Sequence, residues 1–331
     1  MRRIFVLTAV VSLFFSSCDK TEDELKVKDE VVVDEEQEQE EETEEKDDEI
    51  VETEEEETEV VDETVEEKVA KYLPSAGVDK KWVLQENVSN EFDESLTSDA
   101  FVTDWQNKFF NGWKGPGDTR YTPESSTIVD GELIFTAKVV GSTIQTGCIS
   151  SKEKVGYPMY MEARAKISKS VLSTAVWMLS DDSTEEIDNL EAYGYEGHDW
   201  YAKRLHLSHH VFIRDPFQDY QPTSDATWYF DNKNTIWSDD YHDYGVLWMS
   251  PTELSYYVDG VLVRTVPTNE IDPNNFTNGN GLTKPMYIIL SQAAQPWREG
   301  TAFDDFFEEE SVTNSDMTKT YFDWVRVYQP E

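Results

Sequence analysis

The fold of this chain is decided by the stretch Ser183-Thr-Glu-Glu-Ile-Asp-Asn-Leu-Glu-Ala-Tyr-Gly194. It carries three carboxylates, Glu186, Asp188 and Glu191, at the spacing Glu-x-Asp-x-x-Glu. An apolar run at Ala175–Leu179 and a polar turn precede the stretch, and a glycine ends it without the pattern that stops a helix. These flanks predict a β-strand that carries the acids.

The spacing of the acids predicts a bulge in this strand. Side chains alternate along a strand, so Glu186 and Asp188 share one face while Ile187 takes the other. Glu191 has the wrong parity, and the extra residue of a β-bulge would return it to the acidic face and send Leu190 into the core. In a helix, five residues would leave Glu186 and Glu191 roughly 140° apart. The bulged strand is therefore the arrangement that gathers all three acids.

Three carboxylates on one face fit the chemistry of glycoside hydrolysis. Because they repel each other, one of them should hold its proton at neutral pH more tightly than a free side chain does. A retaining glycosidase needs an ionised nucleophile and a protonated acid about 5–5.5 Å apart. From the acid spacing alone, a solvated acidic strand and a Ca²⁺ site remain as alternatives.

The motif Glu186-Ile-Asp-x-x-Glu191 resembles the active-site signature of glycoside hydrolase family 16. The resemblance runs from Trp82 to the C-terminus and is most specific to β-agarases over Ser208–Pro222. It implies an all-β jelly-roll sandwich of two antiparallel sheets with an open concave cleft, and an endo-acting, retaining hydrolase. Glu186 would be the nucleophile, Glu191 the general acid/base and Asp188 the supporting carboxylate. Further segments that resemble β-agarases are Asn111–Gly117, Gly147–Lys152, Tyr160–Lys166 and Tyr256–Thr265.

The same resemblance implies contacts with a sugar chain. Trp113, Trp177 and Trp297 correspond to aromatic residues of agarases, and the C–H faces of pyranose rings stack on indole rings. Arg214 and His242 correspond to groups that hydrogen-bond sugars. The alternative for the tryptophans is packing in the core, and for Arg214 and His242 it is a structural hydrogen bond.

A structural Ca²⁺ away from the cleft is a weaker expectation, again by resemblance. Gly131, in a turn, and Asp323, in the last strand, would supply oxygen ligands, which suit Ca²⁺. The alternative for Asp323 is a hydrogen bond at a strand edge. No zinc site is expected from His206, His209 and His210, because neighbouring residues on a strand point to opposite faces and three of them cannot converge. We expect no cofactor for catalysis.

Residues 1–18 predict a lipoprotein signal peptide. They give a basic start, a short apolar run and Ser16-Ser17-Cys18, which resembles a bacterial lipobox. Lipidation of Cys18 would make it the mature N-terminus and anchor the protein in the membrane, and the alternative is an ordinary secretory signal. Cys148 would then be the single remaining cysteine, and it lies in a β-like run where we expect a buried apolar side chain.

Residues 19–75 predict a disordered acidic linker. Residues 21–70 hold 27 acidic and 4 basic side chains and no aromatic one, so this stretch cannot bury a core. It supplies more than half of the net charge of −41. This charge argues against nucleic acid as a partner, because binding phosphates needs a basic face. We expect an outer-membrane lipoprotein exposed at the cell surface, or otherwise a secreted protein, and a monomer.

Residues 80–331 predict a single all-β catalytic domain. Short runs rich in Val, Ile, Thr, Tyr and Phe alternate with turn residues, and Asp259-Gly260 marks a hairpin. The predicted strand regions are Ser126–Val139, Met159–Ile167, Ala175–Leu179, Lys203–Ser208, Tyr244–Met249, Leu254–Val266, Met286–Ser291 and Tyr321–Tyr328.

The predicted substrate is agarose, cut at β-1,4-galactosidic bonds to neoagaro-oligosaccharides. Sulfated galactans would need basic residues near the site, and only Arg214 and Arg298 are candidates. A β-porphyranase is the alternative, because Ala293 stands where many agarases have an acidic substrate contact and Arg298 could bind a sulfate. A second alternative is a surface glycan-binding lipoprotein without catalysis, which the complete set of three acids disfavours.

Overall fold

The computed structural model describes residues 72–223, 225–298 and 316–331. The predicted signal peptide, Cys18 and residues 19–71 of the predicted linker lie outside these residues. None of the helices in the described part of the chain has the length and apolar character that crossing a bilayer requires.

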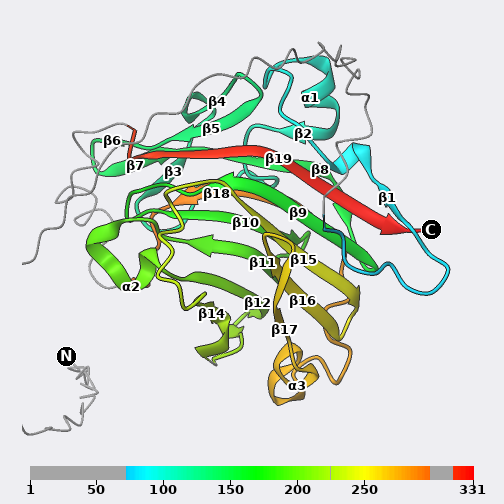
Figure 1. Ribbon diagram of the computed structural model, residues 1–331. Coiled ribbons are helices and arrows are strands. Elements are labelled where there is room, and N and C mark those ends of the chain that lie inside the picture. Colours follow the sequence, from blue (N-terminus) through cyan, green and yellow to red (C-terminus); the bar gives the residue numbers. More distant parts are fainter. Residues whose placement is uncertain (1–71, 224, 299–315) are drawn as a thin grey trace, which may run out of the picture. The chain divides into compact units, whose positions relative to one another are not determined.

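Two large antiparallel sheets form the domain, as predicted for an all-β sandwich (Figure 1). The first sheet has the strand order β17-β16-β15-β9-β19-β5-β4, with β1 on the edge of β19, and the second has the order β13-β12-β11-β10-β18-β8-β2, with β14 on β12. A small third sheet joins β3, β7 and β6. Consecutive positions in each large sheet come from distant parts of the chain, so the concave face of the second sheet combines side chains far apart in sequence.

The first sheet contains β1 (Trp82–Leu84), β4 (Ser126–Val129), β5 (Glu132–Thr136), β9 (Met159–Lys166), β15 (His242–Ser250), β16 (Glu253–Val258), β17 (Val261–Thr265) and β19 (Lys319–Pro330). The second contains β2 (Trp105–Gln106), β8 (Cys148–Val155), β10 (Ser173–Ser180), β11 (Glu185–Ala192), β12 (Leu205–Arg214), β13 (Phe217–Tyr220), β14 (Trp228–Tyr229) and β18 (Met286–Ala293). The third contains β3 (Thr119–Tyr121), β6 (Lys138–Val140) and β7 (Thr143–Thr146). The helices are α1 (Asp99–Asp104), α2 (Asp199–Ala202) and α3 (Thr268–Ile271), and the 3₁₀ turns are η2 (Glu86–Val88), η3 (Pro123–Ser125), η4 (Glu196–His198), η5 (Asp225–Thr227) and η6 (Pro273–Asn275).

The core lies between the facing sides of the two large sheets. Alternate residues of each strand point inward, which buries one apolar set per strand. From the first sheet come Met159, Met161, Ala163, Ala165, Val246 and Trp248, and from the second come Val176, Met178, Ile187, Leu190, Ile288 and Leu290. The opposite side of the second sheet is thereby left for the cleft.

The predicted hairpin between β16 and β17 is confirmed. Asp259 and Gly260 both have positive φ angles, 50° and 73°, as a two-residue turn of type I′ requires. Val258 pairs with Val261 across this turn.

The sequence predicted the long strands better than the short ones. Each predicted strand region contains at least one observed strand, but β1, β2, β3, β7, β13 and β14 were not predicted, because two to four residues give too short a pattern. Cys148 is buried at the start of β8, as expected.

The domain begins before the predicted boundary at residue 80. Leu73 packs against the cluster of Tyr160 and Tyr328, and the indole of Trp82 donates a hydrogen bond to the carbonyl of Pro74 at 2.6 Å. Residues 72–75, predicted as the end of the linker, therefore pack on the domain, because they bring the apolar and aromatic side chains that the acidic stretch lacks.

Replacing Leu190 tests the packing behind the acidic strand. Leu190→Ala should lower the free energy of unfolding by about 2–5 kcal/mol, because it empties a fully buried site between the two sheets. Val261→Ala, at an exposed position, should change it by less than about 0.5 kcal/mol. Urea unfolding of both variants measures the difference, and equal stabilities would contradict the assigned core.

Candidate active site

The predicted bulge in the acidic strand is present. Along the β11–β12 ladder, Asp188 pairs with Ser208 and Glu191 with His206, so β11 has one more residue than β12 in this interval. The extra residue lets Leu190 point into the core, as predicted, while Glu191 joins the other two acids. The buried Asn189 donates from Nδ2 to the carbonyl of Met161, a residue of the first sheet.

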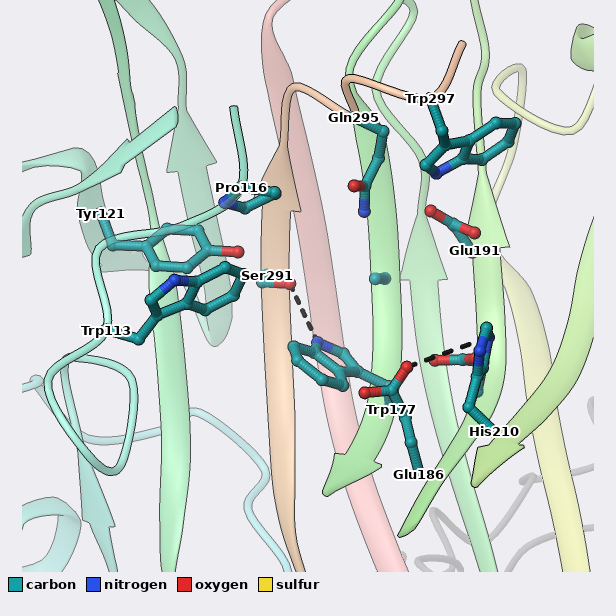
Figure 2. A pocket seen from close by; sticks show the side chains of 12 residues that line it. Trp113, Pro116, Tyr121, Trp177, Glu186, Glu191, His210, Ser291, Gln295 and Trp297 are labelled. Carbon is teal, nitrogen blue, oxygen red and sulfur yellow. Dashed lines mark hydrogen bonds and ion pairs between the residues drawn. The ribbon is translucent and has the colours of Figure 1, made fainter. Parts of the chain in front are cut away.

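The three acids line one cavity of about 220 Å³ on the concave face of the second sheet (Figure 2). They come from β11, while the remaining walls come from β10, β12, β18 and two loops. The lining residues are Trp113, Pro116, Tyr121, Ala175, Trp177, Glu186, Asp188, Glu191, His210, Ser291, Gln295 and Trp297.

His210 is the cation of this cavity. Its Nε2 lies 3.4 Å from Asp188 Oδ2 and 4.0 Å from Glu186 Oε1, and its Nδ1 lies 2.8 Å from Asp219 Oδ1. Burial lowers the pKa of His210, but the hydrogen bonds to Asp188 and Asp219 and the charge of Glu186 outweigh burial and raise the pKa well above its ordinary value. The ring is therefore an imidazolium at neutral pH, and it offsets part of the repulsion among the carboxylates.

Glu186 and Asp188 form a pair that holds a proton. Burial, and after it the charge of Asp188, raises the pKa of Glu186 to about 8. In such a pair the proton belongs to both carboxyl groups, so either residue can carry it. When Asp188 carries the proton, Glu186 is ionised and able to act as a nucleophile at neutral pH.

Glu191 has a different environment from Glu186. The hydroxyl of Tyr193 donates a hydrogen bond to Glu191 Oε1 at 2.7 Å, and Nδ1 of His206 lies 3.3 Å from Oε2. Burial raises the pKa of Glu191, but the hydrogen bonds and charge of His206 and the hydrogen bond from Tyr193 outweigh it and hold the pKa below its usual value. The two glutamates are thus electrostatically distinct, as two different catalytic roles require.

The predicted aromatic platforms lie in the cleft. Trp113 and Trp297 are exposed on loops, and Trp177 is fixed by a hydrogen bond of 3.0 Å from its indole to Ser291 Oγ. Trp113 and Trp177 also line an adjoining cavity of about 540 Å³, which Arg214 borders. The structure therefore brings four predicted substrate residues to one groove, together with the three acids.

His242 is not in this groove. It begins β15 in the other sheet, where its Nδ1 lies 2.8 Å from Asp259 Oδ2 and its ring packs against Trp237. It lines neither cavity, so the structure corrects the expectation that His242 contacts the substrate. The cause is the long connection before β15, which returns the chain to the first sheet.

Two residues linked with sulfate recognition are also buried. Ala293 is 1% exposed and Arg298 is 4% exposed. The Arg298 guanidinium lies between the rings of Tyr193 and Tyr201, donates to the carbonyl of Val171 and bonds His198 Nδ1 at 2.7 Å. The expectation that Arg298 could bind a sulfate is therefore wrong, because its charge is used inside the domain.

Sequence reasoning missed His206, His210 and Tyr193 as parts of the site. The signal for the histidines was strand register, since Glu186 pairs with His210 and Glu191 with His206. An antiparallel partner strand places paired side chains on the same face. Tyr193 follows Glu191 by two residues, so the alternation along β11 indicates its face.

The predicted calcium residues lie on the first sheet. Gly131 is in the turn between β4 and β5 with φ of 81°, and a Cβ there would lie 3.7 Å from Asp93 Oδ1. Asp323 is on β19, which pairs with β5, and its Oδ2 lies 3.4 Å from Arg164 Nε. Carbonyl and carboxylate oxygens fit Ca²⁺, while Arg164 competes for Asp323.

Another group of possible metal-binding atoms in the described residues consists of Glu186, Asp188 and His210, within 4.8 Å of one another. These atoms already form the ion pairs described above, so we assign them to acid–base chemistry and not to metal binding.

Comparison with known proteins agrees with this geometry. Residues 82–330 match the family model described as β-porphyranase A–D, GH16 domain. The chain is 47% identical to β-agarase AgaA of Microbulbifer thermotolerans over 77% of the chain and 60% of that protein. It is 41% identical to β-agarase B of Zobellia galactanivorans over 81% of the chain and 84% of that protein.

The chain spans less than two thirds of some curated relatives, since it covers 46% of β-agarase A of Zobellia galactanivorans. The crystal structure of β-agarase A with oligoagarose matches with a TM-score of 0.73 and 41% identity, covering 78% of this chain and 96% of that one. Inactivated β-agarase B with agaro-octaose matches with a TM-score of 0.72 and 40% identity, covering 78% of this chain and 97% of that one.

A β-porphyranase structure from Bacteroides plebeius matches at 20% identity with a TM-score of 0.63, covering 79% of this chain and 96% of that one, and this shows a shared fold alone. The match over residues 82–330, together with the identity to the agarases, accounts for the acidic strand, its bulge and the sandwich that carries it. The chain belongs to glycoside hydrolase family 16.

Proposed function

We propose that the protein is an endo-acting, retaining β-agarase that cuts β-1,4-galactosidic bonds of agarose. The observation that carries the proposal is the gathering of Glu186, Asp188 and Glu191 in one groove with two distinct electrostatic environments. The similarity to β-agarases, two of which were crystallised with agarose oligosaccharides, supports agarose as the substrate.

The groove suits a polymer. The two cavities share Trp113, Trp177 and Glu186, so they form one continuous surface around the proposed nucleophile. A sugar chain that stacks on Trp113 and Trp177 reaches Glu186 without having to thread an end into an enclosed pocket. This arrangement favours attack within the chain.

In the proposed reaction, ionised Glu186 attacks the anomeric carbon and Glu191 gives its proton to the departing glycosidic oxygen. Asp188 keeps the proton of the Glu186–Asp188 pair, so that the nucleophile is ionised before the attack. Glu191 then takes a proton from the water that hydrolyses the glycosyl-enzyme, which returns both glutamates to their starting states.

The basic residues of the groove favour a neutral galactan. Of the two arginines considered from the sequence, Arg298 is buried and engaged, and only Arg214 borders the groove. A β-porphyranase is the second candidate, and the description of the matching family model favours it.

A comparison of substrates tests the proposal. Purified protein should release reducing sugar from agarose faster than from porphyran, κ-carrageenan or laminarin, because one arginine cannot offset the sulfates of a charged polymer in an acidic groove. The measurement is initial rates on all four polymers at equal concentration. A porphyran rate well above the agarose rate would replace agarose by porphyran, and binding without release would show a glycan-binding protein.

Replacement of the two glutamates tests their roles. Glu186→Gln should reduce turnover by about 10⁴-fold or more and Glu191→Gln by roughly 10²–10⁴-fold, with the fold retained. Azide distinguishes the roles on an activated β-galactoside. Glu186→Ala should give an α-azide, since azide takes the place of the nucleophile, and Glu191→Ala a β-azide formed from the glycosyl-enzyme. Exchanged products, identified by NMR, would exchange the two assignments.

We also propose a structural Ca²⁺ held by oxygen atoms of Gly131 and Asp323. Chelation should then lower the melting temperature, and about 1 kcal/mol of lost binding corresponds to roughly 2–4 °C for a domain of this size. Asp323→Asn should abolish the response to added Ca²⁺. A melting temperature that chelation leaves unchanged would refute this site.

For localisation we propose a lipoprotein anchored through Cys18 and held away from the outer membrane by the acidic linker. Two or three acyl chains anchor stably, whereas one does not, and charge repulsion extends a linker. Cell fractionation should find activity with the membranes, and Cys18→Ala should release it. Wild-type activity found only in the medium would contradict the anchor.

A further inference from the structure

Glu191 is held by one hydrogen-bonding partner on each oxygen. Tyr193 donates to Oε1 at 2.7 Å, and Nδ1 of His206 lies 3.3 Å from Oε2. A carboxylate has about four lone-pair positions, so each oxygen keeps capacity for the substrate side of the cavity. Glu191 itself lines that cavity.

His206 is fixed by its surroundings. It is 8% exposed, it pairs with Glu191 in the β11–β12 ladder, and its ring lies against Trp228 with 4.4 Å between the centroids and 31° between the planes. Because the ring cannot turn away, its distance to the carboxylate is a constant feature of the site.

The charged and titratable groups around Glu191 come from three parts of the fold. Glu186, Asp188 and Tyr193 come from β11, His206 and His210 come from β12, and Arg298, after β18, lies over the Tyr193 ring at 4.4 Å. Only His206 and Tyr193 bond the carboxylate directly among the described residues. Tyr193 donates its hydroxyl hydrogen, whereas a histidine nitrogen either donates to a carboxylate or accepts from a carboxylic acid.

We propose that His206 is a positioning residue that shares one proton with Glu191, so that the two together keep the acid/base loaded during turnover. This rests on the proposed function. As the bond from C1 to the leaving oxygen breaks, its electron pair stays on that oxygen and takes the shared proton from Glu191. Glu186 meanwhile forms the new bond to C1. In the second half, water gives one proton back to the pair.

The sharing has a consequence for pH. The last proton leaves a coupled pair at a pH no lower than it would leave either site alone. Replacing His206 by a group that does not titrate therefore moves the loss of the catalytic proton to lower pH. Tyr193→Phe removes the other hydrogen bond to Glu191 without removing a proton site, so it cannot move this loss to lower pH.

The experiment compares pH profiles of kcat/KM for His206→Asn, Tyr193→Phe and the wild type on an agarose oligosaccharide. The alkaline limb of His206→Asn should lie about one pH unit lower, which means a tenfold lower kcat/KM on that side. The limb of Tyr193→Phe should not fall. His242→Asn, which removes a histidine outside the groove, should match the wild type, and thermal unfolding checks the fold of each variant.

An aryl β-galactoside with a good leaving group separates the pair from a structural effect. Its leaving group departs without protonation, so the alkaline limbs of His206→Asn and the wild type should coincide on it. Coincident limbs on the oligosaccharide would overturn the proposal, and so would an equal displacement on both substrates. A wild-type protein inactive on the oligosaccharide but active on the aryl galactoside would instead refute the proposed function.

Discussion

The pairing of β11 with β12 through a one-residue bulge is the constraint on which the active site depends. Without the extra residue, strict alternation would put Glu191 among the core side chains and Leu190 in the cleft. With it, Leu190 fills the space between the sheets and three carboxylates share one face. The same register sets His210 and His206 opposite Glu186 and Glu191, so one ladder places both the acids and their partners.

Gathering three acids on a half-buried surface is costly, and the site offsets the cost in two ways. His210 contributes a positive charge that faces Glu186, Asp188 and Asp219. The remaining repulsion is relieved by a proton on the Glu186–Asp188 pair. Glu191 is held ionised by other groups, so the two glutamates differ although they lie five residues apart on one strand.

The substrate surface is rigid because its aromatic residues support one another. Phe109 contacts Trp113 edge-on, stacks with Tyr121 and lies 5.7 Å from Trp177. The indole of Trp177 is further fixed by Ser291. Preorganised stacking surfaces lose little conformational entropy when they bind, which favours recognition of a neutral polymer that offers few charges to grip.

The sequence alone determined the all-β class, the acidic strand, its bulge and the hairpin at Asp259-Gly260, because alternation and turn chemistry are local properties. Tertiary structure decided which distant residues meet. It brought His206 and His210 to the acids through strand pairing, kept Arg298 inside the domain between two tyrosines, and returned His242 to the other sheet. Such placements follow from register and topology across hundreds of residues, and no local pattern in the sequence records them.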